Sequence, residues 1–232
     1  MQDFIGVYGI NTVEWSELAK FKCKAGGNNL STICWAPDGS HIIAADSHLS
    51  YKLAVYTPSG EVVAAFEAYQ NALGIKQVLT QERSIFSSVT PQLLPPIESI
   101  VAVGSFDGIV RILSPLSWKL AFELPLTHPK DMHPGLTEKL SSSVQYGKSI
   151  VVTTVEVAES AGAESLHSTL KSTGSSCYVS RNLKTLPRVN PDPNAKGSPK
   201  FGVSGLSSSP DCLFLAAREE SFPRCLWIWD LR

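Results

Sequence analysis

Short apolar stretches separated by turn residues recur along most of the chain. The clearest pair is 100–103 and 109–113, two runs rich in β-branched residues on either side of Asp107-Gly108. An Asp-Gly pair supplies the positive φ that a tight hairpin turn requires, so this stretch predicts strand, turn, strand. Because both runs are continuously apolar rather than alternating, we expect both faces of these strands to be buried.

Four such strands are predicted within 30–66, where turn signals separate each from the next. The turns contain Pro37-Asp38-Gly39 and Pro58-Ser59-Gly60, residues that favour tight turns. The predicted strands are 30–35, 41–45, 51–56 and 61–66. Ahead of them, 4–10 and 12–23 predict two more strands, which would form a partial unit over 1–24.

The same four-strand unit is predicted again over 75–124, and its first three strands recur over 201–232. In the second copy, 79–99 replaces a short turn and is interpreted either as a loop insertion or as an error in the gene model. The third copy lacks a fourth strand and is interpreted as truncated. A four-strand unit repeating at about 40 residues indicates an all-β fold of four-stranded antiparallel sheets, packed as the blades of a β-propeller. Closed propellers need about four to eight blades, so we expect an incomplete propeller, a piece of a longer protein.

The turns and strand ends of these units resemble those of the WD-repeat superfamily. The resemblance rests on 35–39 (WAPDG), 103–108 (VGSFDG) and 227–230 (WIWD), the last ending on the Trp-Asp pair itself. It implies WD-repeat β-propeller blades. The repeat-signature residues are Trp35, Pro37, Asp38, Gly39, Gly104, Asp107, Gly108, Pro210, Asp211, Trp227, Trp229 and Asp230.

Several further runs resemble one lineage of that superfamily, the centrosomal and spindle-pole WD-repeat protein eight family. The matching runs cover most of 1–124 and 197–232, and they resemble the carboxyl-terminal half of that family. They are 51–53 (YKL), 68–69 (AY), 73–76 (LGIK), 103–113, 118–119 (WK), 200–203 (KFGV) and 226–230 (LWIWD).

Residues 125–200 interrupt the repeats with a long irregular insertion rich in Ser, Pro and Gly. Within it, 150–157 and 177–183 predict strands that would form an extra, protruding hairpin, while 158–174 has few large apolar residues and is expected to be disordered. Ser198, in a Ser-Pro-Lys motif among basic residues, is a candidate phosphorylation site.

Composition excludes several broad classes of function. The chain has 232 residues, 18% of them charged, and a formal net charge of −1, which gives no general attraction to nucleic acid or anionic lipid. No apolar run approaches the roughly 20 residues of a membrane helix. Five cysteines without a close pair, and an N-terminus unlike a secretory signal, predict a protein of the reducing cytoplasm.

The sequence offers few candidates for catalysis, metal binding or cofactor binding, and we predict none of these. His128, Asp131 and His133 could ligate a metal, but further ligands at suitable spacing are lacking, so a solvated loop is the preferred interpretation. Glu219, Glu220 and Asp230 are interpreted as surface or turn carboxylates. The five tryptophans are expected to pack between blades.

The predicted function is a non-enzymatic protein-interaction scaffold. Resemblance to the centrosomal family implies microtubule anchoring at the centrosome or spindle pole, roles in spindle assembly and ciliogenesis, and a coiled-coil adaptor as partner. The alternatives are a WD-repeat adaptor of a ubiquitin ligase or RNA-processing complex and, less favoured, a propeller enzyme. As an unclosed propeller, the chain is expected to associate through its end sheets. The side chains expected to be exposed there are Phe4, Ile5 and Val7 at one end and Trp227, Ile228 and Trp229 at the other.

Overall fold

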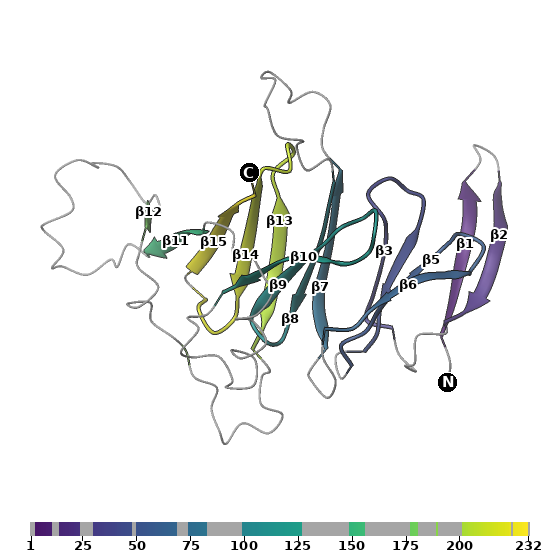
Figure 1. Ribbon diagram of the computed structural model, residues 1–232, viewed down its shortest axis with the longest axis horizontal. Helices are drawn as coiled ribbons and strands as arrows, with labels where there is room; N and C mark the ends of the chain where they lie inside the picture. The colour runs from purple at the N-terminus through teal and green to yellow at the C-terminus, as the bar shows by residue number, and fades with distance from the viewer. Residues whose placement is uncertain are drawn as a thin grey trace, which may run out of the picture.

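The computed structural model describes residues 3–10, 14–23, 30–47, 50–68, 74–82, 99–126, 149–155, 177–180, 189, 201–223 and 225–231. In these residues all regular structure is β-strand, and the strands form four antiparallel sheets. Figure 1 shows the sheets side by side in a row, with the N-terminal sheet at one end and the C-terminal sheet at the other. This arrangement confirms the predicted all-β fold of four-stranded antiparallel sheets and is consistent with an open propeller.

The first sheet consists of β1 (Phe4–Ile10) and β2 (Trp15–Lys22). The two strands pair from Phe4↔Lys22 to Ile10↔Trp15, with a bulge between Val7 and Tyr8. β2 begins three residues later than the 12–23 prediction.

The second sheet contains β3 (Thr32–Trp35), β4 (Ile42–Ala45), β5 (Leu53–Tyr56) and β6 (Val62–Phe66), hydrogen-bonded in chain order. Every residue of the two middle strands is buried, which explains why their sequences are continuously apolar. The turns before β4 and before β6 contain Gly39 at φ +70° and Gly60 at φ +95°, values that glycine adopts without steric cost.

The third sheet contains β7 (Ile75–Glu82), β8 (Ser99–Ser105), β9 (Ile109–Leu113) and β10 (Leu120–Pro125). Gly108 lies in the β8–β9 turn at φ +72°, as its position after Asp107 predicts. The predicted insertion at 79–99 was too long at its start. Residues 79–82 continue β7, because they pair with β8 as far as Glu82↔Ser99; residues 83–98 lie outside the described part.

The fourth sheet has the order β12 (Cys177–Ser180), β11 (Ser149–Val155), β15 (Cys225–Asp230), β14 (Phe214–Glu219), β13 (Val203–Ser208). The prediction of a truncated last unit was wrong, because β11 pairs with β15 from Ser149↔Trp229 to Thr153↔Cys225 and supplies its fourth strand. The predicted hairpin in the insertion forms, but it does not protrude. It extends this sheet as fourth and fifth strands.

Apolar side chains fill each space between successive sheets. One cluster joins the first sheet to the second, another the second to the third, and a third cluster joins the third sheet to the fourth. Ile5 and Val7 belong to the first cluster, and Trp227 and Trp229 to the last. The expectation that these four side chains lie exposed on the end sheets was therefore wrong: each points toward its neighbouring sheet.

Candidate interaction surfaces

Two of the signature segments form equivalent turns between the first and second strands of their sheets. Asp38 accepts hydrogen bonds from the Ser40 amide at 3.1 Å and the Ser40 hydroxyl at 2.6 Å, and these bonds lower the pKa of Asp38. Asp211 accepts from the Leu213 amide at 3.1 Å in the same relative position. Both carboxylates therefore stabilise the backbone conformation of their own turns.

Pro37 and Pro210 precede these two carboxylates and lie in the same turns. Gly39 follows Asp38 at φ +70°, while Cys212 takes the equivalent place at φ +56° with its side chain buried. A cysteine thus occupies a left-handed position that glycine usually fills.

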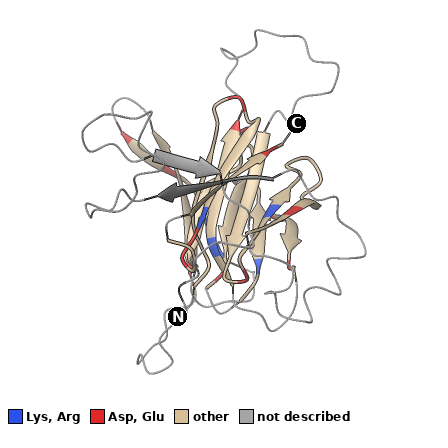
Figure 2. Cartoon of the chain, turned by 90° about the vertical axis from the view of Figure 1, so that its left-hand side faces the viewer, with Lys and Arg blue, Asp and Glu red and all other residues tan. Residues whose placement is uncertain are grey.

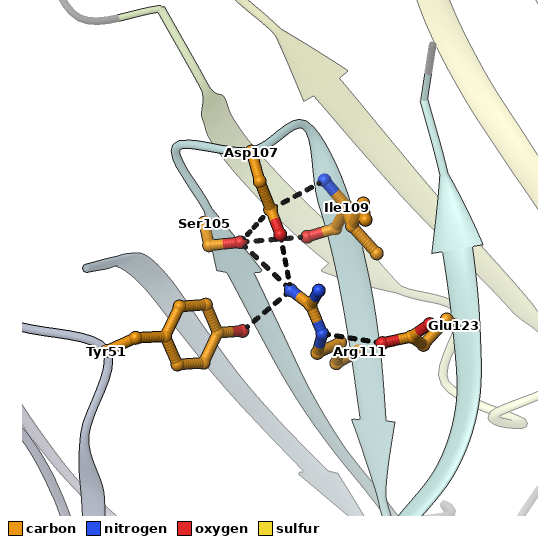
Figure 3. Close-up of polar contacts among 6 residues, drawn as sticks. All are labelled: Tyr51, Ser105, Asp107, Ile109, Arg111 and Glu123. Atoms are coloured by element: carbon orange, nitrogen blue, oxygen red, sulfur yellow. Dashed lines mark hydrogen bonds and ion pairs between the residues drawn. The ribbon is translucent and has the colours of Figure 1, made fainter. Parts of the chain in front are cut away.

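Arg111 on β9 is the centre of the polar network in Figure 3, with 1% of its surface exposed. Its Nε donates to Glu123 Oε1 on the neighbouring β10 at 2.8 Å, and its Nη1 donates to Asp107 Oδ2 at 2.8 Å. The same Nη1 donates to the Tyr51 hydroxyl at 3.1 Å and to Ser105 Oγ at 3.3 Å. The guanidinium therefore joins the β8–β9 turn to β10 and to the segment before β5.

The network fixes the turn that carries the signature residues Asp107 and Gly108. Asp107 Oδ1 accepts from the Ile109 amide at 3.0 Å and from the Ser105 hydroxyl. Burial raises the pKa of Tyr51 to about 12, so its hydroxyl remains protonated well above neutral pH. This is a structural network, since every one of these groups is held by its neighbours and the cation is enclosed.

Arg111 and its partners were not singled out from the sequence, although a signal was available. A single arginine inside the otherwise apolar run 109–113 must be paired if the strand is buried. The sequence could not show which residues pair with Arg111, because Glu123 lies on β10 and Tyr51 lies in the segment before β5.

The signature residue Gly104 lies where the third and fourth sheets approach closely. A Cβ atom on Gly104 would come within 2.6 Å of Val203 Cγ1, and one on Gly202 would come within 2.7 Å of the Phe106 Cα atom. Both positions therefore require glycine for the sheets to pack at this distance.

The tryptophans divide into two groups. Trp118, Trp227 and Trp229 are buried, and the Phe222 ring packs edge-on against Trp227 at 5.5 Å between centroids. Asp230, next to Trp229, is partly buried. The expectation of packing between sheets was wrong for Trp15 and Trp35, which are 71% and 48% exposed.

A partly exposed group lies at the junction of the third and fourth sheets, where the β8–β9 and β14–β15 turns meet. The Lys76 ammonium from β7 lies 5.2 Å from the centre of the Phe106 ring and forms an ion pair with Glu220. The Glu220 amide donates to the Gly202 carbonyl at 3.1 Å. We call Lys76, Phe106 and Glu220 the junction surface; an aromatic ring, a cation and an anion together suit contact with a protein.

The first sheet turns a face with both apolar and charged side chains away from the second sheet, and we call it the outer face. Trp15 and Ile10 pair directly across the two strands, and Leu18 lies at the bulge. The exposed large apolar and aromatic side chains of this face are Phe4, Tyr8, Ile10 and Trp15.

The described residues contain no group of three His, Cys, Asp or Glu side chains able to hold a metal. Nor does the described part contain a helix long and apolar enough to cross a membrane. His128, Asp131, His133 and Ser198 lie outside the described residues. In Figure 2 charged positions of both signs are scattered among mostly uncharged strands.

No family model matches the chain. The mouse (Mus musculus) WD repeat-containing protein WRAP73 is 26% identical over 239 residues, an alignment that covers 100% of this chain and 45% of the relative. The chain thus spans about half the length of the curated relative that it matches.

Among solved structures, Sqt1 from Chaetomium thermophilum, bound to the N-terminus of the ribosomal protein L10, aligns with 92% of this chain and 47% of its own at a TM-score of 0.35 and 11% identity. Sqt1 from the same organism in a second structure aligns with 93% and 50% at the same score. Because these TM-scores are low, the description of the fold rests on the arrangement of the sheets alone. The recurring four-stranded sheets and a match to a WD repeat-containing protein along the whole chain support placing it in the WD-repeat superfamily.

Proposed function

We propose that the chain is a protein-interaction scaffold of the cytoplasm that acts at the centrosome or spindle pole and helps to anchor microtubules there. The observation that carries the proposal is the alignment of the whole chain with a WD repeat-containing protein. The runs that resemble the centrosomal family supply the cellular role, including spindle assembly, cilium formation and a coiled-coil adaptor as partner. Scaffold function suits rigid sheets that present turns to solvent.

The junction surface is the proposed contact site for the adaptor. It combines turns from two sheets. The Arg111 network fixes the conformation of the β8–β9 turn, and the close approach at Gly104 and Gly202 fixes the distance between the third and fourth sheets. A rigidly held aromatic ring loses little conformational entropy on binding, which favours its use as an anchor.

Affinity purification of the tagged full-length protein from dividing cells, followed by mass spectrometry, tests the role. We expect centrosomal coiled-coil proteins to co-purify. We further expect Phe106→Ala to reduce their recovery several-fold, because an interface anchor typically contributes about 2 kcal/mol or more. Leu116→Ala is the matched control, since Leu116 is an exposed apolar residue in the turn at the opposite end of β9.

Both variants must keep the melting temperature of the parent for the comparison to hold. Recovery of ubiquitin-ligase subunits or ribonucleoproteins in place of centrosomal proteins would reject the cellular role. Equal losses with Phe106→Ala and Leu116→Ala would reject the junction surface.

A further inference from the structure

β6 forms one edge of the second sheet. It pairs with β5 on one side, and in the described part of the chain no strand is hydrogen-bonded to its other side. That free side presents backbone N–H and C=O groups that can pair with an added strand. Such an edge allows β-augmentation, in which an extended segment of another polypeptide joins the sheet.

The sequence of β6 does not carry the residues that discourage pairing at an edge. Edge strands of soluble proteins are commonly protected by charged side chains or by proline. The last strand of the first sheet, β2, contains three charged residues, and that of the third sheet, β10, ends in Pro125. β6 (VVAAF) contains neither a charge nor a proline, and its Val62 and Val63 side chains are 45% and 47% exposed.

The fourth sheet shows that a strand in this place accepts a further strand. β11 has the position in the fourth sheet that β6 has in the second, and β12 pairs with it antiparallel from Val152↔Ser180 to Val155↔Cys177. β12 is thus the fifth strand of its sheet. In β6, a bulge interrupts the pairing with β5 at Val63, and regular pairing follows from there to the end of the strand. A short strand of the length of β12 therefore suffices.

The charges and side-chain sizes along β6 define the segment that fits. Glu61 and Glu67 are exposed and lie directly before and directly after the apolar run. Basic residues at both ends of an added strand would face these carboxylates. Ala64 and Ala65 in the middle are small, so large apolar side chains of the added strand can pack over them.

We propose that the free edge of β6 binds a short apolar strand, flanked by Lys or Arg, that a partner protein supplies by antiparallel β-augmentation. The added strand lies about 4.8 Å from β6. Its backbone pairs with the free N–H and C=O groups, and its basic ends pair with Glu61 and Glu67. The site stands on the edge of the second sheet and does not depend on the proposed cellular role.

A second copy of the chain fits this edge poorly. Two β6 strands paired antiparallel along the whole run would be centred on Ala64, and each Glu61 would then lie opposite a Glu67. Like charges directly opposite each other destabilise a pair of strands, and two facing alanines bury little apolar surface. The occupant that fits is therefore a different polypeptide.

Peptide probes test the site in the full chain, at concentrations where light scattering shows a monomer. The probe KVLIVK carries a fluorophore, and its binding is measured by fluorescence anisotropy. We expect it to bind and to slow hydrogen exchange about tenfold in 62–67. The probe EVLIVE should bind about tenfold more weakly, because both of its ends repel the carboxylates. KVLIVK methylated at the backbone nitrogens of its four apolar residues should not bind, because it keeps the side chains but loses the donors.

A charge reversal in the chain provides the matched variant. Glu61→Lys combined with Glu67→Lys should reverse the preference, so that EVLIVE binds about tenfold more tightly than KVLIVK. Glu14→Lys is the control, because Glu14 is exposed directly before β2, and this variant should keep the preference of the parent.

Several results would overturn the proposal. They are no binding of KVLIVK at millimolar concentration, equal binding of the methylated probe, an unchanged preference in the double variant, and protection that falls outside 62–67. Protection of 62–67 that rises with protein concentration in the absence of any probe would also overturn it, because the edge would then bind a second copy.

Discussion

Arg111 shows how one residue holds several segments of the third sheet together. Its guanidinium lies between two carboxylates whose side chains are 7% and 11% exposed, Asp107 and Glu123. Arg111→Met keeps much of the volume but leaves both carboxylates buried without their cation. We expect a loss of about 3–5 kcal/mol in the free energy of unfolding, measured by urea denaturation.

Arg218→Met is the matched control for that experiment, because Arg218 is exposed on β14. Its effect should stay within about 0.5 kcal/mol. Similar losses for both variants would mean that the network contributes no more than an ordinary surface arginine.

Tyr51 makes the stability of the fold depend on pH in the alkaline range. Burial raises its pKa to about 12 in the folded state, against an ordinary value of 10.0. Because the folded state keeps the proton longer, the contribution is fully present below pH 10 and is lost as pH rises toward 12. There the free energy of unfolding should fall by up to about 1.4 kcal/mol per pH unit more steeply in the parent than in Tyr51→Phe. Parallel pH curves for the two proteins would contradict this.

For individual residues, the sequence predicted the local backbone conformation better than it predicted the hydrogen-bond partners of side chains. Asp107-Gly108 was recognised as a tight turn because the signal is two adjacent residues, and Gly108 has the expected positive φ. The exposure of Trp35 was not foreseen. Whether one face of a strand is buried depends on how many strands the neighbouring sheet has. The sequence of β3 contains no information about that number.

At the scale of elements, Gly202 decides how closely the fourth sheet approaches the third. Its Cβ position lies 2.7 Å from the Phe106 Cα and 2.9 Å from the Ser105 carbonyl oxygen, and neither backbone atom can move aside cheaply. Gly202→Ala should therefore destabilise the protein by about 1–3 kcal/mol. The loss is measured by thermal unfolding, with the change in melting temperature converted to a change in the free energy of unfolding.

Gly205→Ala is the matched control in β13, which begins directly after Gly202, since the nearest atom to the Gly205 Cβ position is Arg218 Cβ at 3.8 Å. That substitution should be neutral or stabilise by up to about 1 kcal/mol, because alanine restricts the unfolded chain. Equal destabilisation by both would show that backbone freedom matters at these positions and the close approach does not.

The fourth sheet shows that the sequence predicted individual strands but not how they pair. The apolar run at 150–157 was recognised as a strand, but the pairing of β11 with β15 joins segments about 75 residues apart in the chain. Apolar patterning identifies strands and says little about which edge accepts them, since any open edge offers the same backbone groups. For the same reason β7 was predicted four residues short: its end contains Thr80, Gln81 and Glu82, polar residues held by pairing with β8.

At the scale of the whole molecule, the row of sheets ends in the outer face of the first sheet, and this face should drive self-association. On this face Ile10 and Trp15 are 74% and 71% exposed, and they pair directly across the two strands. Burying a large apolar side chain contributes roughly 1.5–3 kcal/mol, so a few of them can hold two molecules together at micromolar concentration. We expect the molar mass from light scattering to rise with concentration.

Ile10→Lys combined with Trp15→Glu should restore a monomer, because two charged side chains on the outer face make its burial costly while leaving the inward residues Ile5 and Val7 unchanged. Leu116→Lys is the control. Leu116 is 95% exposed but lies alone in the β9–β10 turn, so its substitution should not change the association. If the parent remains a monomer at all concentrations, the outer face is too small or too irregular to bind a second molecule. If only Leu116→Lys abolishes association, the contact lies at that turn, and the first sheet plays no part in it.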